Sequence, residues 1–394
     1  MNILSILATL VLLVFGYFYF FKLKHGFKVK KRQFDMSGKT HKFVDIGEQC
    51  IDHCAICEKL IVYGNIFGSK AKKCLICGVI CHKICLKVKG LTQPCKQLML
   101  PSEDKIKKHQ CAHRKLEDEE RCSVCTQYCN NIAHYHNFTC LWCNKVRHNY
   151  CKDDSDCTFG RFEALSILPH EIVKLTTNPE TNKTSIEFKF TKHKSIPLFI
   201  ANKLSGPQFG ESTMEFLYQH LNPIQVFDLL DEGISRLEIF KGIPDLKVIV
   251  AGGDGTMGGL VDAIYSILGR NISLIPMPLG TGNDLSRALG WGEGISTKRD
   301  VKYFLKYLET KPLPTLFDRW HIKITSKKNP ENVLLDLKML LYFGIGLDAK
   351  FSYQFNAIRK KAPFFFKSRV CSHYLTLDRQ QVLLQPSRNV QSSG

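Results

Sequence analysis

The sequence is short of negative charge: 36 aspartates and glutamates stand against 55 lysines and arginines, which leaves a formal net charge of +19. This imbalance indicates an anionic partner, but it does not distinguish nucleic acid from anionic lipid or nucleotide phosphates. The sequence also lacks the lysine motif of a P-loop, which argues against that kind of nucleotide site. Hydrophobic residues are not scarce, and their 44% share excludes global disorder. A length of 394 residues suits two or three domains.

Charge is absent altogether from residues 3–21, which read ILSILATLVLLVFGYFYFF. About 20 apolar residues span a bilayer as a helix. The basic residues that follow predict that the C-terminal side faces the cytosol; they are Lys22, Lys24, Lys28, Lys30, Lys31 and Arg32. We therefore expect a single-pass transmembrane helix, or signal anchor, in the endoplasmic reticulum or plasma membrane, with the bulk of the chain cytosolic.

Two alternatives for this segment stay open. A cleaved signal peptide fits less well, because no basic segment precedes the apolar run and no small-residue cleavage site follows it. A re-entrant hairpin bent at Gly16 is the other alternative.

Cysteine is plentiful, with 17 residues, and twelve of these join four histidines in two copies of one pattern. The first copy consists of His41, Cys54, Cys57, Cys74, Cys77, His82, Cys85 and Cys95. The second consists of His109, Cys122, Cys125, Cys140, Cys143, His148, Cys151 and Cys157. Eight ligands a copy suit two tetrahedral zinc ions, and the paired C-x2-C units favour zinc thiolates in a reducing compartment over disulfides. Metal would also stabilise modules of only about 50 residues, which lack a sufficient core.

The pattern of apolar and polar residues changes near residue 195. We interpret the preceding stretch, residues 158–194, as a linker because of its prolines and its polar TNPETNKTS turn. Apolar runs at 196–201, 246–251 and 273–277 predict buried strands. Helical patterns follow at 212–221 and 260–268. Glycine-rich turns lie between strand and helix, which is where α/β proteins bind phosphates.

The turn GGDGTMGG at residues 252–259 contains G-x-G-x-x-G, a dinucleotide-binding pattern. That interpretation is disfavoured, because Asp254 would repel a pyrophosphate unless a cation lay between them. A carboxylate beside backbone amides does suit Mg²⁺ bound to phosphate oxygens. Asp284 and Asp318 are further candidate magnesium ligands, and the alternative for each aspartate is a helix cap.

The cysteine and histidine spacing resembles that of the C1 domain, the cysteine-rich module of lipid-responsive kinases. The resemblance implies two zinc ions per domain, at 41–95 and 109–157, with interleaved ligands. It groups His41, Cys74, Cys77 and Cys95; Cys54, Cys57, His82 and Cys85; His109, Cys140, Cys143 and Cys157; and Cys122, Cys125, His148 and Cys151. The tip loops lack the proline and glutamine of diacylglycerol-binding members, so we favour a structural or membrane-orienting role over diacylglycerol sensing. No nucleic acid is expected, because no base-reading helix fits between these ligands.

The GGDGT motif marks a superfamily of diacylglycerol kinases, sphingosine kinases and NAD kinases. Four further stretches resemble the diacylglycerol kinases: LNPIQVFDLLDEG at 221–233, PLGTGNDLSRALGWG at 278–292, FDRW, and LYFGIGLDAKFSYQF at 341–355. The N-terminal segment and two C1 modules resemble the epsilon-type subclass. The implied fold at 195–369 is the front part of an α/β, Rossmann-like kinase domain of the NAD kinase and diacylglycerol kinase type. Its β-rich accessory lobe would be incomplete, and residues 370–394 form a divergent tail.

The same resemblance implies transfer of the γ-phosphate of ATP to membrane diacylglycerol, giving phosphatidate for lipid signalling, next to an anionic lipid surface. The residues implied around the nucleotide are Asn202, Ser205, Gly253, Asp254, Gly255, Thr256, Gly280, Thr281, Gly282 and Asn283. Asp254, Asp284 and Asp318 would organise magnesium and serve catalysis.

The resemblance stops after Arg369, from which we expect weak or no kinase activity. A non-catalytic membrane adaptor with zinc modules and a vestigial nucleotide fold is the alternative. NAD kinase activity is disfavoured, because neither an anchor nor zinc modules serve a soluble substrate.

Overall fold

The computed structural model describes a large part of the chain, and the fold is given for that part. The described residues are 40–46, 50–63, 71–99, 108–113, 120–129, 137–177, 184–190, 194–203, 205 and 209–361. The predicted membrane segment at 3–21 and the tail at 370–394 lie outside them. Within these ranges no helix is long and apolar enough to cross a bilayer.

The repeat seen in the sequence is also a repeat of strands. Module 1, residues 41–95, has a three-stranded antiparallel sheet in the order β1–β4–β5 and a hairpin of β2 and β3. Its elements are β1 (Phe43–Asp45), β2 (Cys50–His53), β3 (Leu60–Tyr63), β4 (Ala71–Cys74), β5 (Ile80–His82) and α2 (Lys83–Val88). Module 2, residues 109–157, repeats this plan with the order β6–β9–β10 and a hairpin of β7 and β8. Its strands are β6 (Cys111–Ala112), β7 (Glu120–Arg121), β8 (Tyr128–Cys129), β9 (Asn137–Cys140) and β10 (Val146–His148).

The stretch interpreted as a linker, residues 158–194, is more ordered than we expected. It contains the turns η3 (Glu163–Leu165) and η4 (Pro169–Glu171) and the antiparallel strands β11 (Ile172–Thr177) and β12 (Thr184–Phe188). The polar turn that suggested a linker connects these two strands. The buried side chain of Gln225 fixes the stretch to the following domain: its amide donates to the Leu165 carbonyl at 2.9 Å and accepts from Ile167 N–H at 2.6 Å. Local composition does not reveal such long-range bonds, so this order was not expected.

The α/β domain is built on a parallel sheet in the order β14–β13–β15–β16. The strands are β13 (Ile196–Ala201), β14 (Val226–Asp228), β15 (Leu246–Gly252) and β16 (Ser273–Pro278). The three apolar runs in the sequence thus form strands where predicted. Every residue of β13 and β15 is buried, as expected for central parallel strands covered on both faces.

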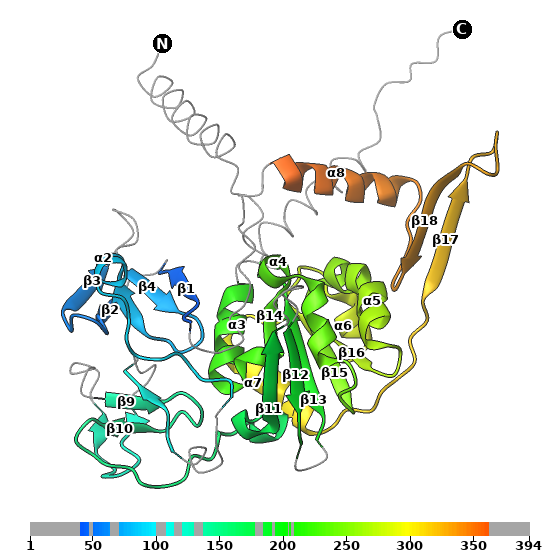
Figure 1. The fold of residues 1–394 in the computed structure, drawn as a ribbon. Helices are drawn as coiled ribbons and strands as arrows, with labels where there is room; N and C mark the ends of the chain where they lie inside the picture. Colours follow the sequence, from blue (N-terminus) through cyan, green and yellow to red (C-terminus); the bar gives the residue numbers. More distant parts are fainter. Residues whose placement is uncertain are drawn as a thin grey trace, which may run out of the picture. The chain divides into compact units, whose positions relative to one another are not determined.

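Helices cover both faces of this sheet (Figure 1). Helices α3 and α7 lie against one face, and α5 and α6 lie against the other. The elements between the strands are α3 (Phe209–His220), η5 (Pro223–Gln225), α4 (Leu229–Glu232), η6 (Ile234–Phe240), α5 (Asp254–Leu268), α6 (Asp284–Ala288) and α7 (Lys298–Glu309). Thr297 caps α7, whose buried residues Val301, Phe304, Leu305 and Leu308 repeat at the spacing of one helix face.

Helix α5 begins at Asp254, six residues before the predicted start at residue 260. The glycines at 255, 258 and 259 suggested a turn, but they lie within the first two turns of the helix. Glycine lowers helix propensity by only about 1 kcal/mol per residue, which tertiary context overrides here.

After α7 the chain forms an antiparallel hairpin of β17 (Trp320–Thr325) and β18 (Val333–Met339), followed by α8 (Leu347–Lys361). The hairpin exposes most of its residues.

Candidate functional site

Four turns in the two modules share one backbone conformation. In each, the residue directly after a C-x2-C pair has a positive φ: Glu58, Gly78, Thr126 and Asn144. The N–H of that residue donates to the carbonyl of the first cysteine over 2.8 to 3.1 Å. Positive φ is unfavourable for residues with a side chain and persists only where the surroundings impose it. The repetition indicates that the turns are shaped to aim two thiolates at one point.

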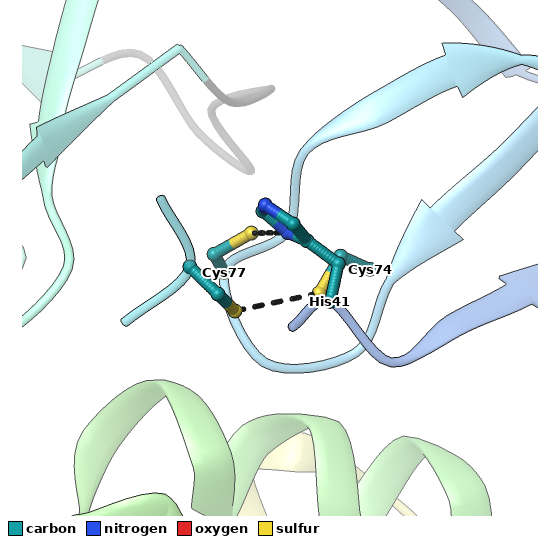
Figure 2. Close-up of side chains that lie close together, drawn as sticks. His41, Cys74 and Cys77 are labelled. Atoms are coloured by element: carbon teal, nitrogen blue, oxygen red, sulfur yellow. Dashed lines mark hydrogen bonds between the residues drawn. The ribbon is translucent and has the colours of Figure 1, made fainter. Parts of the chain in front are cut away.

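These turns assemble four groups of cysteine and histidine, and the groups match those implied by the C1 resemblance. They are His41, Cys74, Cys77 and Cys95; Cys54, Cys57, His82 and Cys85; His109, Cys140, Cys143 and Cys157; and Cys122, Cys125, His148 and Cys151. Within each group the candidate ligand atoms all lie within 4.8 Å of one another. Figure 2 shows His41, Cys74 and Cys77 converging, with Cys77 Sγ 3.3 Å from His41 Nδ1. Tetrahedral sulfur and nitrogen sets of this kind suit zinc.

The histidines present the same ring nitrogen in all four groups. Nδ1 lies 3.3 to 3.4 Å from a cysteine Sγ in each case. Nε2 of His41 lies 2.9 Å from the Gln93 carbonyl, and Nε2 of His148 lies 3.3 Å from the Tyr128 carbonyl. A carbonyl accepts only from a protonated nitrogen, so Nε2 carries the proton and Nδ1 keeps the lone pair that a metal needs.

Two cysteines are prepared to be thiolates near neutral pH. Burial opposes ionisation of Cys54, but backbone N–H groups, His82 first among them, lower its pKa to about 7. Burial likewise opposes ionisation of Cys122, while the N–H groups of Cys125, Val124 and His148 lower its pKa to about 6. Burial raises the pKa of Cys81, which belongs to none of the four groups, to about 12. Thiolates are the form that binds metal, so Cys54 and Cys122 are well prepared for it, whereas burial raises the pKa of Cys85 and Cys151 in the same groups to about 11.

Lys96 joins both modules to the α/β domain, and sequence reasoning missed it. Its side chain is 1% exposed, and its ammonium donates to the carbonyls of Tyr218, Gln219 and Leu221 at 3.0, 3.1 and 2.8 Å. These carbonyls end α3, where a cation is favourable. The same ammonium lies 4.3 Å from the ring centre of Trp142 in module 2. The only local signal is a lysine directly after the ligand Cys95.

The α/β domain gathers the predicted nucleotide residues at one edge of its sheet. β13 comes first in the chain and lies between β14 and β15, so the connections leave β13 and β15 in opposite directions. Ligands of open α/β sheets bind at such a reversal, outside the carboxyl ends of the strands. The Asn202 amide group donates to Thr256 Oγ1 at 3.3 Å, and Leu279 N–H donates to the Gly252 carbonyl at 3.1 Å. The turns after β13, β15 and β16 therefore meet.

Glycine is required where two of these turns touch. A Cβ added to Gly280 would lie 2.5 Å from Gly253 Cα and 2.8 Å from Asn283 Oδ1. Asn283 is buried, and its amide donates to the carbonyls of Gly280 and Glu293 at 3.0 and 2.8 Å. It therefore shapes the turn, while Thr281 and Gly282 are exposed beside it.

Asp254 connects the turns after β15 and β16. Its carboxylate accepts the N–H groups of Asp284 and Leu285 at 3.0 and 3.1 Å, so it caps α6. A Cβ added to Gly282 would lie 3.6 Å from an oxygen of Asp254 and 3.6 Å from an oxygen of Asp284. A carboxylate has about four lone-pair positions, so two remain on Asp254 for a cation or water. The cap and magnesium interpretations are compatible.

Asp318 makes no hydrogen bond or ion pair to Asp254 or Asp284 in the described part of the chain. Among the described residues, the three predicted magnesium aspartates do not form a group with oxygens within 4.8 Å. Asp318 is exposed, and the next residue, Arg319, binds Asp262 on α5 through two hydrogen bonds of 2.5 and 2.7 Å. The hydrogen bond from Arg319 holds the pKa of Asp262 at about 2. This ion pair ties the Asp318 segment to the helix that begins at Asp254.

A second missed cation lies beside the site. Lys203 follows Asn202 directly, and its ammonium lies 3.0 Å from Asp228 and 2.5 Å from Asp231. Partial burial lowers the pKa of Lys203, but the hydrogen bonds to Asp231 and Asp228 outweigh it, so the pKa is raised overall. Asp228 is buried at the end of β14, so this contact fixes the turn after β13 against the neighbouring strand.

Residues 197–307 match the model of the diacylglycerol kinase catalytic domain. The chain is a relative of the diacylglycerol kinases. Human diacylglycerol kinase kappa is 30% identical over 71% of this chain and 23% of its own length. Rat diacylglycerol kinase iota is 27% identical over 76% of this chain and 33% of its length. Drosophila melanogaster diacylglycerol kinase 1 is 29% identical over 71% of this chain and 24% of its length.

These comparisons confirm the resemblance to the diacylglycerol kinase family, while the epsilon-type subclass stays a prediction. The chain spans a third or less of the length of these curated relatives. No solved structure matches the chain.

Proposed function

We propose that this chain transfers the γ-phosphate of ATP to the free hydroxyl of a membrane diacylglycerol. The observation that carries the proposal is the contact between the turns after β15 and β16. Asp254 begins α5, and its carboxylate accepts N–H groups at the start of α6, at the point where the strand order of the sheet reverses. The matched catalytic-domain model covers both turns. The relatives are named as diacylglycerol kinases, which supports this substrate class.

The residues at this edge would bind the nucleotide mainly through the backbone. Backbone N–H groups at the start of α5 and in the turn at 280–282 would donate to phosphate oxygens, and the helix dipole favours the negative charge of a phosphate there. Gly253 and Gly280 permit the close approach of the two turns. Catalysis would rest on positioning and on charge neutralisation, as is usual for phosphoryl transfer.

Asp254 and Asp284 are the residues suited to hold magnesium, because their oxygens flank the same point beside Gly282. Magnesium keeps several waters and needs only one or two carboxylates when phosphates supply other ligands. The donor set therefore fits the ion, which would neutralise phosphate charge. Asp318 would act through water, since the three carboxylates do not gather their oxygens within 4.8 Å of one another.

We also propose that the four cysteine and histidine groups bind structural zinc, and that residues 3–21 anchor the chain in the membrane of its lipid substrate. Closed sets of four ligands support a structural over a catalytic metal. An anchor would serve the reaction because diacylglycerol stays in the bilayer.

Phosphate transfer from radiolabelled ATP to diacylglycerol in mixed micelles tests the proposal. We expect magnesium-dependent phosphatidate formation that falls about 100-fold or more in Asp254→Asn. Asp245→Asn is the matched control, because Asp245 is exposed at the opposite end of β15 and asparagine tolerates its positive φ. Magnesium-dependent ATP binding without transfer would instead support the non-catalytic adaptor, and equal activity of the two variants would refute the assignment of Asp254.

A further inference from the structure

A cavity of about 1160 Å³ lies between helix α5 and residues 312–319. One wall is formed by α5, β16 and the start of α6, and the other by residues 312–319 and the β17–β18 hairpin. Most of the lining is apolar, and it includes Met257, Val261, Leu274, Leu285, Trp291 and Leu316. This volume exceeds the range of about 300 to 1,000 Å³ that is typical of small-molecule pockets.

One end of the cavity is basic. Lys247 on β15 lines it and is only 9% exposed, and Arg270 lines it three residues before Ser273, the strand partner of Lys247. In the described part of the chain, neither side chain has an ion-pair or hydrogen-bond partner. The Lys247 ammonium is not sealed from solvent and Arg270 is exposed, so both positive charges lie at the mouth of the cavity, where they favour an anion.

The remaining charges in the lining are already matched. Arg319 and Lys338 both face Asp262, and His321 faces Asp336. The unmatched positive charge is therefore concentrated at Lys247 and Arg270, at the amino-terminal end of the sheet. The long apolar wall extends from there toward Met257 and Leu285.

We propose that this cavity binds an anionic lipid, a long alkyl chain ending in a phosphate or carboxylate. Lys247 and Arg270 hold the headgroup, and the chain lies along α5 toward Trp291. A soluble anion would leave the apolar wall in water, and a neutral lipid would leave Lys247 without a partner. The site does not depend on the proposed kinase reaction, because its headgroup end lies at the amino-terminal end of β15, opposite the turns that follow β15 and β16.

Trp291 provides a direct test, because bromine atoms on a bound chain quench a neighbouring indole. Dibrominated stearate, titrated below its micelle concentration, should quench the fluorescence of the full chain with saturation. The variant Trp291→Phe should lose this quenching although Trp142 and Trp320 remain. Quenching that does not saturate, or that persists in Trp291→Phe, would place the lipid elsewhere and overturn the proposal.

Charge variants test the headgroup assignment. Lys247→Met and Arg270→Met should each weaken binding about tenfold, because each removes a charge-assisted bond. Lys247→Arg should retain binding, which shows that a folded cavity is present, and Lys302→Met on the exposed face of α7 should leave binding unchanged. Unaltered affinity in both methionine variants would refute the proposed headgroup site.

Competition identifies the headgroup. Unlabelled stearate and lysophosphatidate are each used to displace the dibrominated stearate. The stronger competitor shows whether the site prefers a carboxylate or a phosphate. Stearyl alcohol and inorganic phosphate should compete poorly, because each lacks one half of the ligand. Equal competition by stearyl alcohol would mean that charge plays no part, contrary to the proposal.

Discussion

The two cysteine-rich modules and the α/β domain bury different kinds of side chain. The buried side chains of module 2 belong to two small clusters. One consists of Cys140, Trp142 and Cys157 with Phe159 and Leu168 from the stretch that follows the module, and the other of Cys122, Cys129, Val146 and Cys151. Several members of these clusters are the candidate ligands themselves. In the α/β domain, two entire strands are buried among apolar side chains. Small modules without a metal have too little apolar surface to bury, whereas the larger sheet does not need one.

Metal removal should produce the largest difference in unfolding between the two modules and the α/β domain. A chelator should unfold both modules, because structural zinc contributes about 10 kcal/mol or more of apparent binding energy to such folds. Hydrogen exchange should show loss of amide protection in β4, β5, β9 and β10 and retained protection in β15. Loss of protection in β15 to the same extent would mean that the chain is a single metal-dependent unit.

Counting the bound zinc ions tests whether the modules bind metal through the four ligand groups. The purified chain should hold four zinc ions, and Cys77→Ala should lower the number measured by mass spectrometry. Cys81→Ala is the control, because Cys81 is buried in the same module but belongs to no ligand group. An equal loss of zinc in both variants would contradict the grouping.

Lys96→Met tests the contact between the two regions. We expect a loss of about 2–3 kcal/mol in the free energy of unfolding, because three carbonyls at the end of α3 lose a charged donor. Chemical denaturation followed by the fluorescence of Trp142 and Trp291 measures this loss. Lys87→Met, on the exposed last turn of α2, should change stability by less than about 0.5 kcal/mol. Equal effects of the two substitutions would show that Lys96 does not connect the regions.

The exposed ion pair between Asp262 and Arg319 should have the smallest effect. Asp262→Asn should cost about 0.5–1 kcal/mol near neutral pH, since solvent weakens a surface pair even with two hydrogen bonds. The folded pKa of about 2 lies below the unfolded value of about 4, so the pair stabilises fully above pH 4 and is lost as pH falls through 2. Thermal denaturation of both proteins between pH 5 and pH 2 should show their difference vanishing at the acidic end. A constant difference would exclude the ion pair as its cause.

Local patterns predicted much of this molecule. Uninterrupted apolar runs located β13, β15 and β16, because buried parallel strands need such runs. The repeated spacing predicted two sites per module, and the resemblance to C1 domains implied the four groups of side chains that the fold brings together. That these groups bind zinc, and that Asp254 binds magnesium, stays a prediction.

Features made by distant residues were not predictable in this way. Gln225 orders the supposed linker from about 60 positions away, and Lys96 reaches α3 across more than 120. The pairing of Lys203 with Asp228 also depends on which strands become neighbours. None of these contacts leaves a periodic or compositional signal in the sequence.

The central claim is that the joined turns after β15 and β16 bind a magnesium nucleotide. Calorimetric titration with ATP, with and without Mg²⁺, tests it in Gly280→Ala and Gly259→Ala. The first Cβ would meet Gly253 at 2.5 Å, while the second meets nothing within 4 Å. We predict magnesium-dependent binding that weakens at least tenfold in Gly280→Ala and is retained in Gly259→Ala, with circular dichroism confirming that both fold. Equal ATP affinity in the two variants, or no binding by the unaltered chain, would contradict the claim.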